Sequence, residues 1–168
     1  MTTVFNTDGG IHEIPLPAGA GRLWLCGKHF IGPQVEDVLA SCDDAIAVCL
    51  VQEHELQDRY PHYIDWHETH ANNRAIWFPI DDLSYPPLED CLEFITTLTA
   101  HIQSGQSLVV HCAAGIGRAG TTATAILIML GMNADDALDH VRAHRPMAGP
   151  EAGSQREFIA DLAHHIGS

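Results

Sequence analysis

Apolar residues along the chain fall into short runs and longer stripes with helical spacing. Four runs of strand length, each ended by turn or polar residues, predict buried strands at 22–26, 45–51, 75–80 and 107–111. Apolar stripes with a period near 3.6 predict helices within 35–42, 88–102 and 123–130. Because strands alternate with helices, the pattern favours an α/β fold with a mainly parallel central sheet of about four to five strands flanked by helices. We expect a single domain spanning residues 1–168.

The C-terminal third is predicted to be mostly helical. Asn133 begins a helix that Pro146 closes, and Ser154 with Glu157 has the pattern of a capping box before a final apolar stripe. Two long polar segments are predicted to be loops, 52–73 and 81–87. Long polar loops often carry functional residues.

Charge and hydropathy restrict the partners that we expect. The 22 acidic and 8 basic residues give a net charge of −14, which disfavours binding to a nucleic-acid backbone. The longest apolar stretch, 121–132, is too short to cross a bilayer, and the first residues lack the pattern of a targeting segment. We therefore expect a soluble, cytoplasmic protein without membrane association, with a monomer as the default.

The numbers of cysteines and histidines make disulfide bonds and metal sites possibilities to consider. The five cysteines are odd in number and form no CxxC pair, which predicts reduced thiols. His67 with His70, and His140 with His144, have the spacing of ligands on one helix face, but no ordered third ligand accompanies either pair. We expect solvated helix faces there, with no metal and no other cofactor.

Residues 109–120, VVHCAAGIGRAG, are the most informative stretch. They predict a strand, a glycine-spaced loop and a helix, so that backbone N–H groups can converge on one tetrahedral oxyanion at a helix N-terminus. Arg118 can complete this cradle with a bidentate fork. The same dipoles favour the thiolate of Cys112, lowering its pKa from roughly 8.5 toward the range of about 3.5 to 7.5 seen at helix N-termini. The expected phosphate-binding residues are Ala113, Ala114, Gly115, Ile116, Gly117 and Arg118.

An alternative interpretation makes Cys112 a small buried hydrophobic residue. The glycines at 115, 117 and 120 would then only form a turn. The coincidence of histidine, cysteine, three glycines and arginine in one short segment favours the catalytic interpretation.

The segment HCAAGIGR resembles the His-Cys-x5-Arg signature of the protein tyrosine phosphatase superfamily, in its compact dual-specificity branch. WFPIDDLSYPP resembles the general-acid loop of that branch, RAHRPMAGPEAGSQREF its closing Arg-Pro and glutamine segment, and LWLCGKHFIGPQ its opening strand and turn. The resemblance implies a phosphate loop between strand and helix. It also implies a metal-independent, two-step transfer in which the cysteine takes the phosphoryl group and water then hydrolyses the phosphocysteine.

The resemblance also implies roles for individual residues. Asp82 is the favoured general acid, with Asp81 as the alternative, and either side chain can instead form an Asx turn. Gln155 matches the glutamine that positions water in the family. The alternative is that Gln155 is an exposed glutamine in the first turn of the last helix. His111 helps to shape the loop and the thiolate, which is compatible with a hydrogen bond to a backbone carbonyl.

Ala119 is a departure from this pattern. The family generally has serine or threonine there, whose hydroxyl stabilises the departing thiolate, so the second step is expected to be slow. The phosphatases of regenerating liver resemble the chain in having alanine there and paired aspartates in the acid loop. The chain ends without a prenylation box, so we do not carry over membrane anchoring.

Cys49 is a redox candidate that the resemblance suggests. It lies in a predicted strand beside the one that ends at Cys112, and related compact phosphatases use a cysteine at a corresponding position. A buried core thiol without a redox role is the alternative.

These observations favour a cysteine-dependent phosphatase acting on phosphotyrosine in proteins, with phosphoserine or phosphothreonine activity as an extension; small phosphate esters are the other expected substrates. No lysine lies within the loop, which disfavours polyanionic head groups. One alternative is a phosphate-recognising binding module or slow pseudophosphatase, suggested by Ala119 and the net charge. Sulfur or arsenate transfer is another, but it leaves the acid loop and the glutamine segment unexplained.

Overall fold

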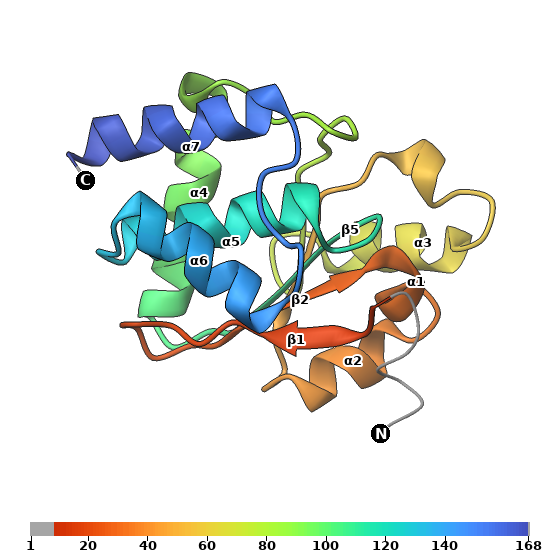
Figure 1. Ribbon diagram of the computed structural model, residues 1–168. Helices are drawn as coiled ribbons and strands as arrows, with labels where there is room; N and C mark the ends of the chain where they lie inside the picture. Colours follow the sequence, from red (N-terminus) through yellow and green to blue (C-terminus); the bar gives the residue numbers. More distant parts are fainter. Residues whose placement is uncertain (1–8, 168) are drawn as a thin grey trace.

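The computed structural model describes residues 9–167, which form an α/β fold around one five-stranded sheet (Figure 1). The sheet has the order β1-β2-β5-β3-β4, and only β1 is antiparallel to its neighbour. The predicted fold class is confirmed. Two predictions concern residues outside this range. They are the domain boundaries at residues 1 and 168 and the absence of a targeting segment at the N-terminus. The strands are β1 (Ile11–Glu13), β2 (Leu23–Gly27), β3 (Ile46–Cys49), β4 (Ala75–Trp77) and β5 (Leu108–Cys112).

Seven α-helices connect or cover these strands in the described residues. The sequence pattern predicted the positions of α2, α4 and α6, and it placed the start of α5 six residues too late, because Gly117 and Gly120 have low helix propensity. The helices are α1 (Lys28–Ile31), α2 (Val35–Ser41), α3 (Pro61–His70), α4 (Leu88–Gln103), α5 (Gly117–Met129), α6 (Ala134–His144) and α7 (Gly153–Ile166).

The segment 52–73 is not the predicted loop. It contains a 3₁₀ turn, η2 (Glu53–Glu55), and the ten-residue helix α3. Pro61 occupies the first turn of α3, where a missing N–H costs nothing. The buried face of α3 consists of Tyr63, Ile64 and His67, and its polar or amphipathic members hid the helical stripe in the sequence.

The start of α7 also differs from the prediction. Ala152 is the N-cap residue and makes no side-chain cap, so the capping box of Ser154 and Glu157 is wrong. Ser154 lies inside the helix, where its Oγ accepts a 3.2 Å hydrogen bond from the backbone N–H of Tyr85. Its hydroxyl therefore ties α7 to the predicted acid loop. The predicted cap of α6 is correct, because Asn133 accepts a 2.9 Å bond from the N–H of Asp136.

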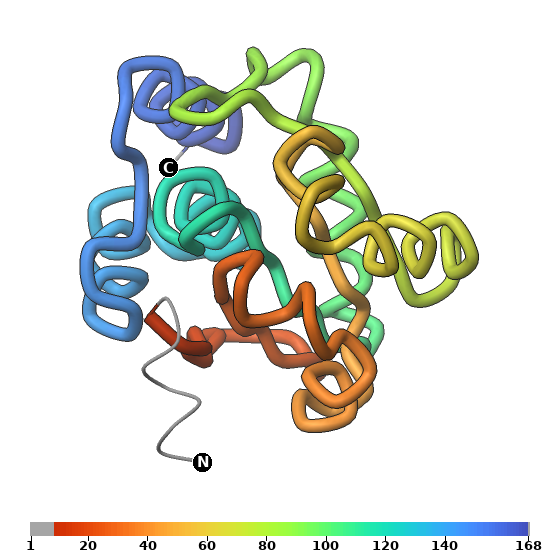
Figure 2. The backbone as a smooth tube through the Cα atoms, turned by 90° about the vertical axis from the view of Figure 1, so that its right-hand side faces the viewer, coloured from red at the N-terminus to blue at the C-terminus, as the bar shows by residue number. Residues whose placement is uncertain are grey.

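Helix α5 is the core of the helical layer. It packs on β5 and β2, and α4, α6 and α7 surround it, whereas α2 contacts β3 and α3 contacts β4 (Figures 1 and 2). Every residue from Gly117 to Ile128 is buried, as expected of a helix covered on all sides. All residues of β5 are buried too. The junction between the central strand and this central helix is thus anchored on both sides.

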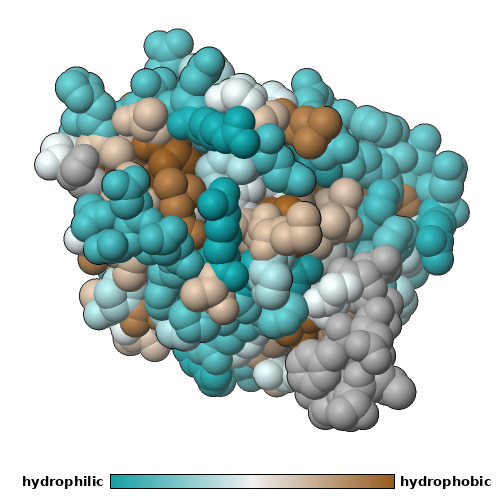
Figure 3. All heavy atoms as spheres, in the orientation of Figure 1, coloured by the Kyte–Doolittle hydropathy of each residue, from teal (hydrophilic) through white to brown (hydrophobic). Residues whose placement is uncertain are grey.

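On the face shown in Figure 3, hydrophilic side chains dominate and apolar ones occupy smaller patches. Among residues 9–167, none of the helices has the length and apolar character needed to cross a membrane.

Candidate active site

Cys112 ends β5, the central strand, and lines a cavity of about 240 Å³. Its side chain is only 3 % exposed, and its Sγ accepts a 3.4 Å hydrogen bond from the N–H of Ala119 in the first turns of α5. The thiol therefore faces a backbone donor at a helix N-terminus, as predicted. Besides Cys112, the cavity is lined by Ala113, Ala114, Ile116, Gly117, Arg118, Asp82, Leu83 and Glu151.

Arg145 holds the loop from behind. This buried side chain donates from Nη2 to the carbonyl of Ala114 and from Nε to the carbonyl of Gly115, each at 2.8 Å. In a trans peptide the next N–H points the opposite way from the carbonyl. The N–H groups of Gly115 and Ile116 consequently point away from Arg145, which orients them for an anion on the loop's other side.

Two of the three glycines are required, for different reasons. Gly115 has φ +74°, and a Cβ there would lie 2.5 Å from the carbonyl oxygen of Cys26. Gly117 is helical, and a Cβ there would meet the movable end of the Glu151 side chain, whereas a Cβ at Gly120, in the first turn of α5, would lie 2.1 Å from the backbone nitrogen of Gly149. The glycine spacing thus serves one left-handed turn and one close approach, rather than positive φ throughout.

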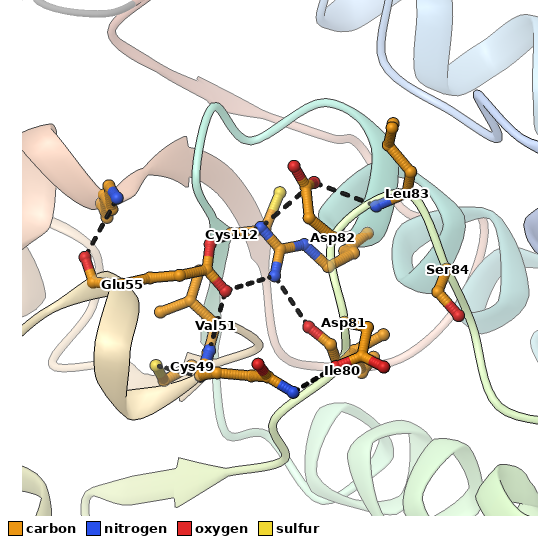
Figure 4. A network of polar contacts seen from close by, with 12 residues as sticks. Cys49, Val51, Glu55, Ile80, Asp81, Asp82, Leu83, Ser84 and Cys112 are labelled. Carbon is orange, nitrogen blue, oxygen red and sulfur yellow. Dashed lines mark hydrogen bonds and ion pairs between the residues drawn. The ribbon is translucent and has the colours of Figure 1, made fainter.

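Arg118 lines the cavity and contacts three acceptors, Glu55, Ile80 and Asp82. Figure 4 labels these three residues. Nη1 and Nη2 each donate to Glu55 at 2.9 Å in a bidentate pair, and Nη1 also donates to the carbonyl of Ile80 at 2.8 Å. Nη2 lies 3.4 Å from Oδ1 of Asp82. Burial and these partners together leave the pKa of Arg118 above its ordinary value, so the guanidinium is permanently charged. The pair also holds the pKa of Glu55 below its ordinary value, although burial opposes that.

The two candidate acids occupy different positions. Asp82 lines the cavity, with 70 % of its side chain exposed, and its Oδ1 accepts a 3.0 Å hydrogen bond from the N–H of Leu83. Asp81 accepts a hydrogen bond from the side-chain amide of Gln52 and does not line the cavity. The structure therefore brings Asp82, and not Asp81, together with Cys112 and Arg118 (Figure 4).

His111 is buried next to the nucleophile, on the strand rather than in the cavity. Its Nδ1 lies 3.4 Å from the carbonyl of Cys112, which can only accept, so Nδ1 carries the proton. Nε2 of the neutral ring then accepts the 2.8 Å hydrogen bond from the hydroxyl of Tyr63. Burial lowers the pKa of His111 to about 3, in agreement with a neutral imidazole. Both the loop-shaping role and the carbonyl-bonded alternative are compatible with this geometry.

Gln155 is fully buried, so the exposed alternative is wrong. Its Oε1 accepts a 2.7 Å hydrogen bond from the N–H of Glu151, and its Nε2 donates to the carbonyl of Ser84 at 3.3 Å. Gln155 thus joins the end of the acid loop to the segment that carries Glu151 into the cavity. A water-positioning role stays a prediction.

Cys49 lies on β3, directly opposite His111 of β5. All five cysteines are free and buried, and the Sγ of Cys49 lies 3.9 Å from the carbonyl of Val51. Burial raises the pKa of Cys49 well above its ordinary value, which keeps it a protonated thiol. Its oxidative pairing with Cys112 stays a prediction.

The two histidine pairs differ from each other. His140 and His144 are partly exposed and bond the backbone carbonyls of Pro15 and His140, respectively. His70 bonds the carbonyl of Trp66, but His67 is only 3 % exposed, so the expectation of a solvated face is wrong for His67.

Sequence reasoning missed four residues that contact or line the site. They share one property, which is that each reaches the loop through tertiary packing from a distant segment. The Arg-Pro pair at 145–146 belongs to a segment that resembles the family, but no signal in the sequence indicates that Arg145 is buried or which groups it binds. The four are Glu55, Tyr63, Arg145 and Glu151.

Comparison with known proteins agrees with this geometry. The model of a family described as "Polymorphic toxin system, DSP-PTPase phosphatase" matches residues 32–132. Dual specificity protein phosphatase 1 of Arabidopsis thaliana is 37 % identical over 71 residues, which cover 42 % of this chain and 34 % of that protein. The chain therefore spans about a third of the length of this relative.

Solved structures extend the likeness across nearly the whole chain. The crystal structure of Tk-PTP in the active form has a TM-score of 0.69 and 24 % identity, and covers 90 % of this chain and 96 % of its own. Kinase associated phosphatase with its catalytic-site cysteine replaced by serine has a TM-score of 0.77 and 20 % identity, with coverages of 94 % and 96 %. These two structures show the shared fold. With the family match over 32–132, they establish that the chain belongs to the DSP-PTPase phosphatases, in the compact dual-specificity branch of the protein tyrosine phosphatase superfamily.

Proposed function

We propose that this chain hydrolyses phosphate monoesters through a phosphocysteine intermediate, with Cys112 as nucleophile, Arg118 as phosphate ligand and Asp82 as general acid. One observation carries the proposal: these three side chains line the same cavity, at the strand-to-helix junction whose backbone N–H groups favour an anion. With these groups, the proposed reaction needs no metal or other cofactor.

Phosphate binding uses the free edge of Arg118. Nη1 is held by Glu55 and the carbonyl of Ile80, while Nη2 has its weakest contact with Asp82, at 3.4 Å. Within the described residues, Nε has no hydrogen-bond partner. A bound phosphate can thus accept from Nε and Nη2, the bidentate geometry that guanidinium favours, and displace Asp82 from Nη2.

Transfer then proceeds in two balanced steps. The thiolate of Cys112 forms a bond to phosphorus as the ester bond breaks, and Asp82 gives its proton to the departing oxygen. Water next attacks the phosphocysteine, the sulfur leaves as thiolate, and Asp82 takes up the water's proton. The displacement of Asp82 from Arg118 by substrate couples binding to the availability of the acid.

The cavity walls support one class of substrate over another. Leu83, Ile116 and the alanines of the loop offer apolar contacts to an aromatic ring, while the carboxylates of Asp82 and Glu151 oppose additional phosphates. These features favour phosphotyrosine in proteins, with phosphoserine and phosphothreonine as expected extensions, over polyanionic lipid head groups.

A phosphate-recognising pseudophosphatase is the second candidate. Ala119 favours it, because the side chain at this position offers no hydroxyl to the departing sulfur. Such a protein would bind phosphate, transfer it to Cys112 and turn over slowly.

Turnover of an aryl phosphate tests the proposal directly. Cys112→Ser should abolish turnover while retaining binding of inorganic phosphate, and Cys42→Ser, another buried thiol, should keep the wild-type rate. Dialysis against EDTA should leave the rate unchanged. Substantial turnover by Cys112→Ser would overturn the mechanism. Absence of turnover in the wild type with intact phosphate binding would favour the pseudophosphatase.

A further inference from the structure

A buried cluster of metal-ligating side chains lies behind the phosphate loop, outside the cavity. One potential ligand atom from each of Cys49, His67 and His111 lies within 4.8 Å of the others, and all three residues are buried. They come from three elements, β3, α3 and β5, so neither the sequence nor its spacing indicated the cluster. None of the three lines the active-site cavity.

His67 provides the independent sign of a ligand. Its side chain is 97 % buried, and neither ring nitrogen has a hydrogen-bond partner among the residues that the structure describes. Its neighbours are aromatic: the rings of Tyr63, Trp66 and Trp77 have centroids 4.7, 5.3 and 5.6 Å from that of His67. Leaving a buried polar group without a partner is energetically unfavourable. A hydrophobic residue would fill this space without that cost.

We propose that Cys49, His67 and His111 form a binding site for a thiophilic divalent cation of the zinc type. Two imidazoles and one thiolate are ligands that Zn²⁺ prefers, whereas Mg²⁺ and Ca²⁺ require oxygen donors, and the cluster includes no carboxylate. All three residues are buried, which shields their ligand atoms from solvent.

Coordination requires a small contraction and one proton release. Tetrahedral Zn–S and Zn–N bonds of about 2.3 and 2.0 Å place the ligand atoms roughly 3.3–3.6 Å apart, so atoms separated by as much as 4.8 Å must close by about 1.2–1.5 Å through side-chain rotation. The thiol proton of Cys49 passes to solvent as the thiolate binds. His111 coordinates through Nε2, releasing the hydroxyl of Tyr63, and its Nδ1–H keeps the carbonyl of Cys112 as partner.

The site would connect metal binding to the nucleophile's immediate neighbour. His111 precedes Cys112, so an ion on His111 fixes the end of β5 on which the loop begins. It would also hold Cys49 as a metal thiolate and make it unavailable to an oxidised Cys112. This inference is independent of the proposed function, because binding is measurable in a protein without the catalytic thiol.

The test uses the full chain with Cys112→Ser, which removes the active-site sulfur as a competing ligand. Zn²⁺ is added to the folded protein and, because the cluster is buried, also during refolding from urea; bound metal is measured after equilibrium dialysis. We expect one tightly bound Zn²⁺ per chain, a higher midpoint of thermal unfolding, and no such effect of Mg²⁺. Co²⁺ in its place should show a thiolate-to-metal charge-transfer band.

Matched variants in that background decide which residues bind. His67→Leu and Cys49→Ser should each weaken Zn²⁺ binding at least about 100-fold, since even groups that only orient ligands contribute 10- to 100-fold. His70→Leu, on the same helix but outside the cluster, should bind as the parent does. His67→Leu removes the unpartnered nitrogens, so it is expected to fold, which circular dichroism checks. Failure to bind Zn²⁺ under both loading conditions, binding unchanged in His67→Leu or Cys49→Ser, or a Co²⁺ spectrum without the thiolate band would each overturn the site.

Discussion

The phosphate loop and the acid loop meet at one cavity but are held in contrasting ways. The phosphate loop is surrounded by buried groups: Arg145 binds its carbonyls, α5 continues its end, and a backbone N–H contacts Cys112. In the acid loop, Asp82 is largely exposed, and Leu83 is 57 % exposed with a φ of +59°. For a non-glycine residue that conformation costs about 1–2 kcal/mol.

The contrast assigns different physical tasks to the two loops. A cradle that stabilises a transferring phosphoryl group works best when its dipoles are oriented in advance, because no reorganisation is then needed during the reaction. A general acid must instead meet leaving groups of different shape and return for the second step. A strained, weakly held loop suits the acid, while a fully bonded loop suits the anion.

The largest expected effect comes from a change in the phosphate loop, which buried contacts hold in place. Arg118 is the only cation that residues 9–167 contribute to the cavity lining, so in Arg118→Ala the kcat/KM for an aryl phosphate should fall at least about 10³-fold, together with phosphate binding. Arg118→Lys should recover little, because a lysine lacks the fork. Arg59→Ala, an exposed arginine near Glu55 in sequence, serves as the control and should change kcat/KM less than about twofold. Full activity in Arg118→Lys would contradict bidentate binding.

Arg145 tests whether the loop's orientation depends on its support from behind. Arg145→Met leaves the carbonyls of Ala114 and Gly115 without their buried donor, and we expect roughly a 10²-fold loss of kcat/KM and a lower midpoint of thermal unfolding. Arg145 does not line the cavity, so weaker inhibition by phosphate in this variant would report a distorted cradle. Arg142→Met, an exposed change in the last turn of α6 just before Arg145, should alter neither measurement. Unchanged phosphate inhibition in Arg145→Met would show that the loop keeps its shape without this support.

A change in the exposed acid loop should slow some substrates more than others. Asp82→Asn removes the proton donor, so hydrolysis of esters with basic leaving groups should slow by about 10²-fold or more, and that of nitrophenyl-type esters much less. Asp81→Asn is the matched control, because Asp81 bonds Gln52 outside the cavity. Plots of rate against leaving-group pKa distinguish the two, and a steeper slope for Asp81→Asn would exchange their roles.

Local and long-range contacts explain how much the sequence could predict. The nucleophile, the loop and its arginine lie within seven consecutive residues, so their geometry follows from one strand, one turn and one helix. Glu55 reaches Arg118 across 63 positions from a segment predicted as a loop, and only packing determines that contact. His67 is an extreme case, since a histidine in a polar helix gives no sign that its side chain is buried.

The smallest expected effect concerns the departing sulfur. Ala119 offers no hydroxyl, but its backbone N–H already contacts Cys112 Sγ at 3.4 Å, so part of the stabilisation is present. Thr122 does not replace the hydroxyl, because its Oγ1 bonds the carbonyl of Arg118 and the hydroxyl of Tyr85. Thr121 has a buried Oγ1 without a hydrogen-bond partner among residues 9–167.

Rapid mixing with an aryl phosphate should show this missing hydroxyl as a burst of one aryl alcohol per enzyme, followed by slower turnover. Ala119→Ser should raise the steady rate by roughly twofold to tenfold, the equivalent of one hydrogen bond worth about 0.5–1.5 kcal/mol. Ala123→Ser, another buried position one turn further along α5, should give no gain. If the wild type shows no burst and Ala119→Ser no gain, the first step limits turnover or Thr121 supplies the hydroxyl. Thr121→Val separates these outcomes, because only in the second case does it create a burst.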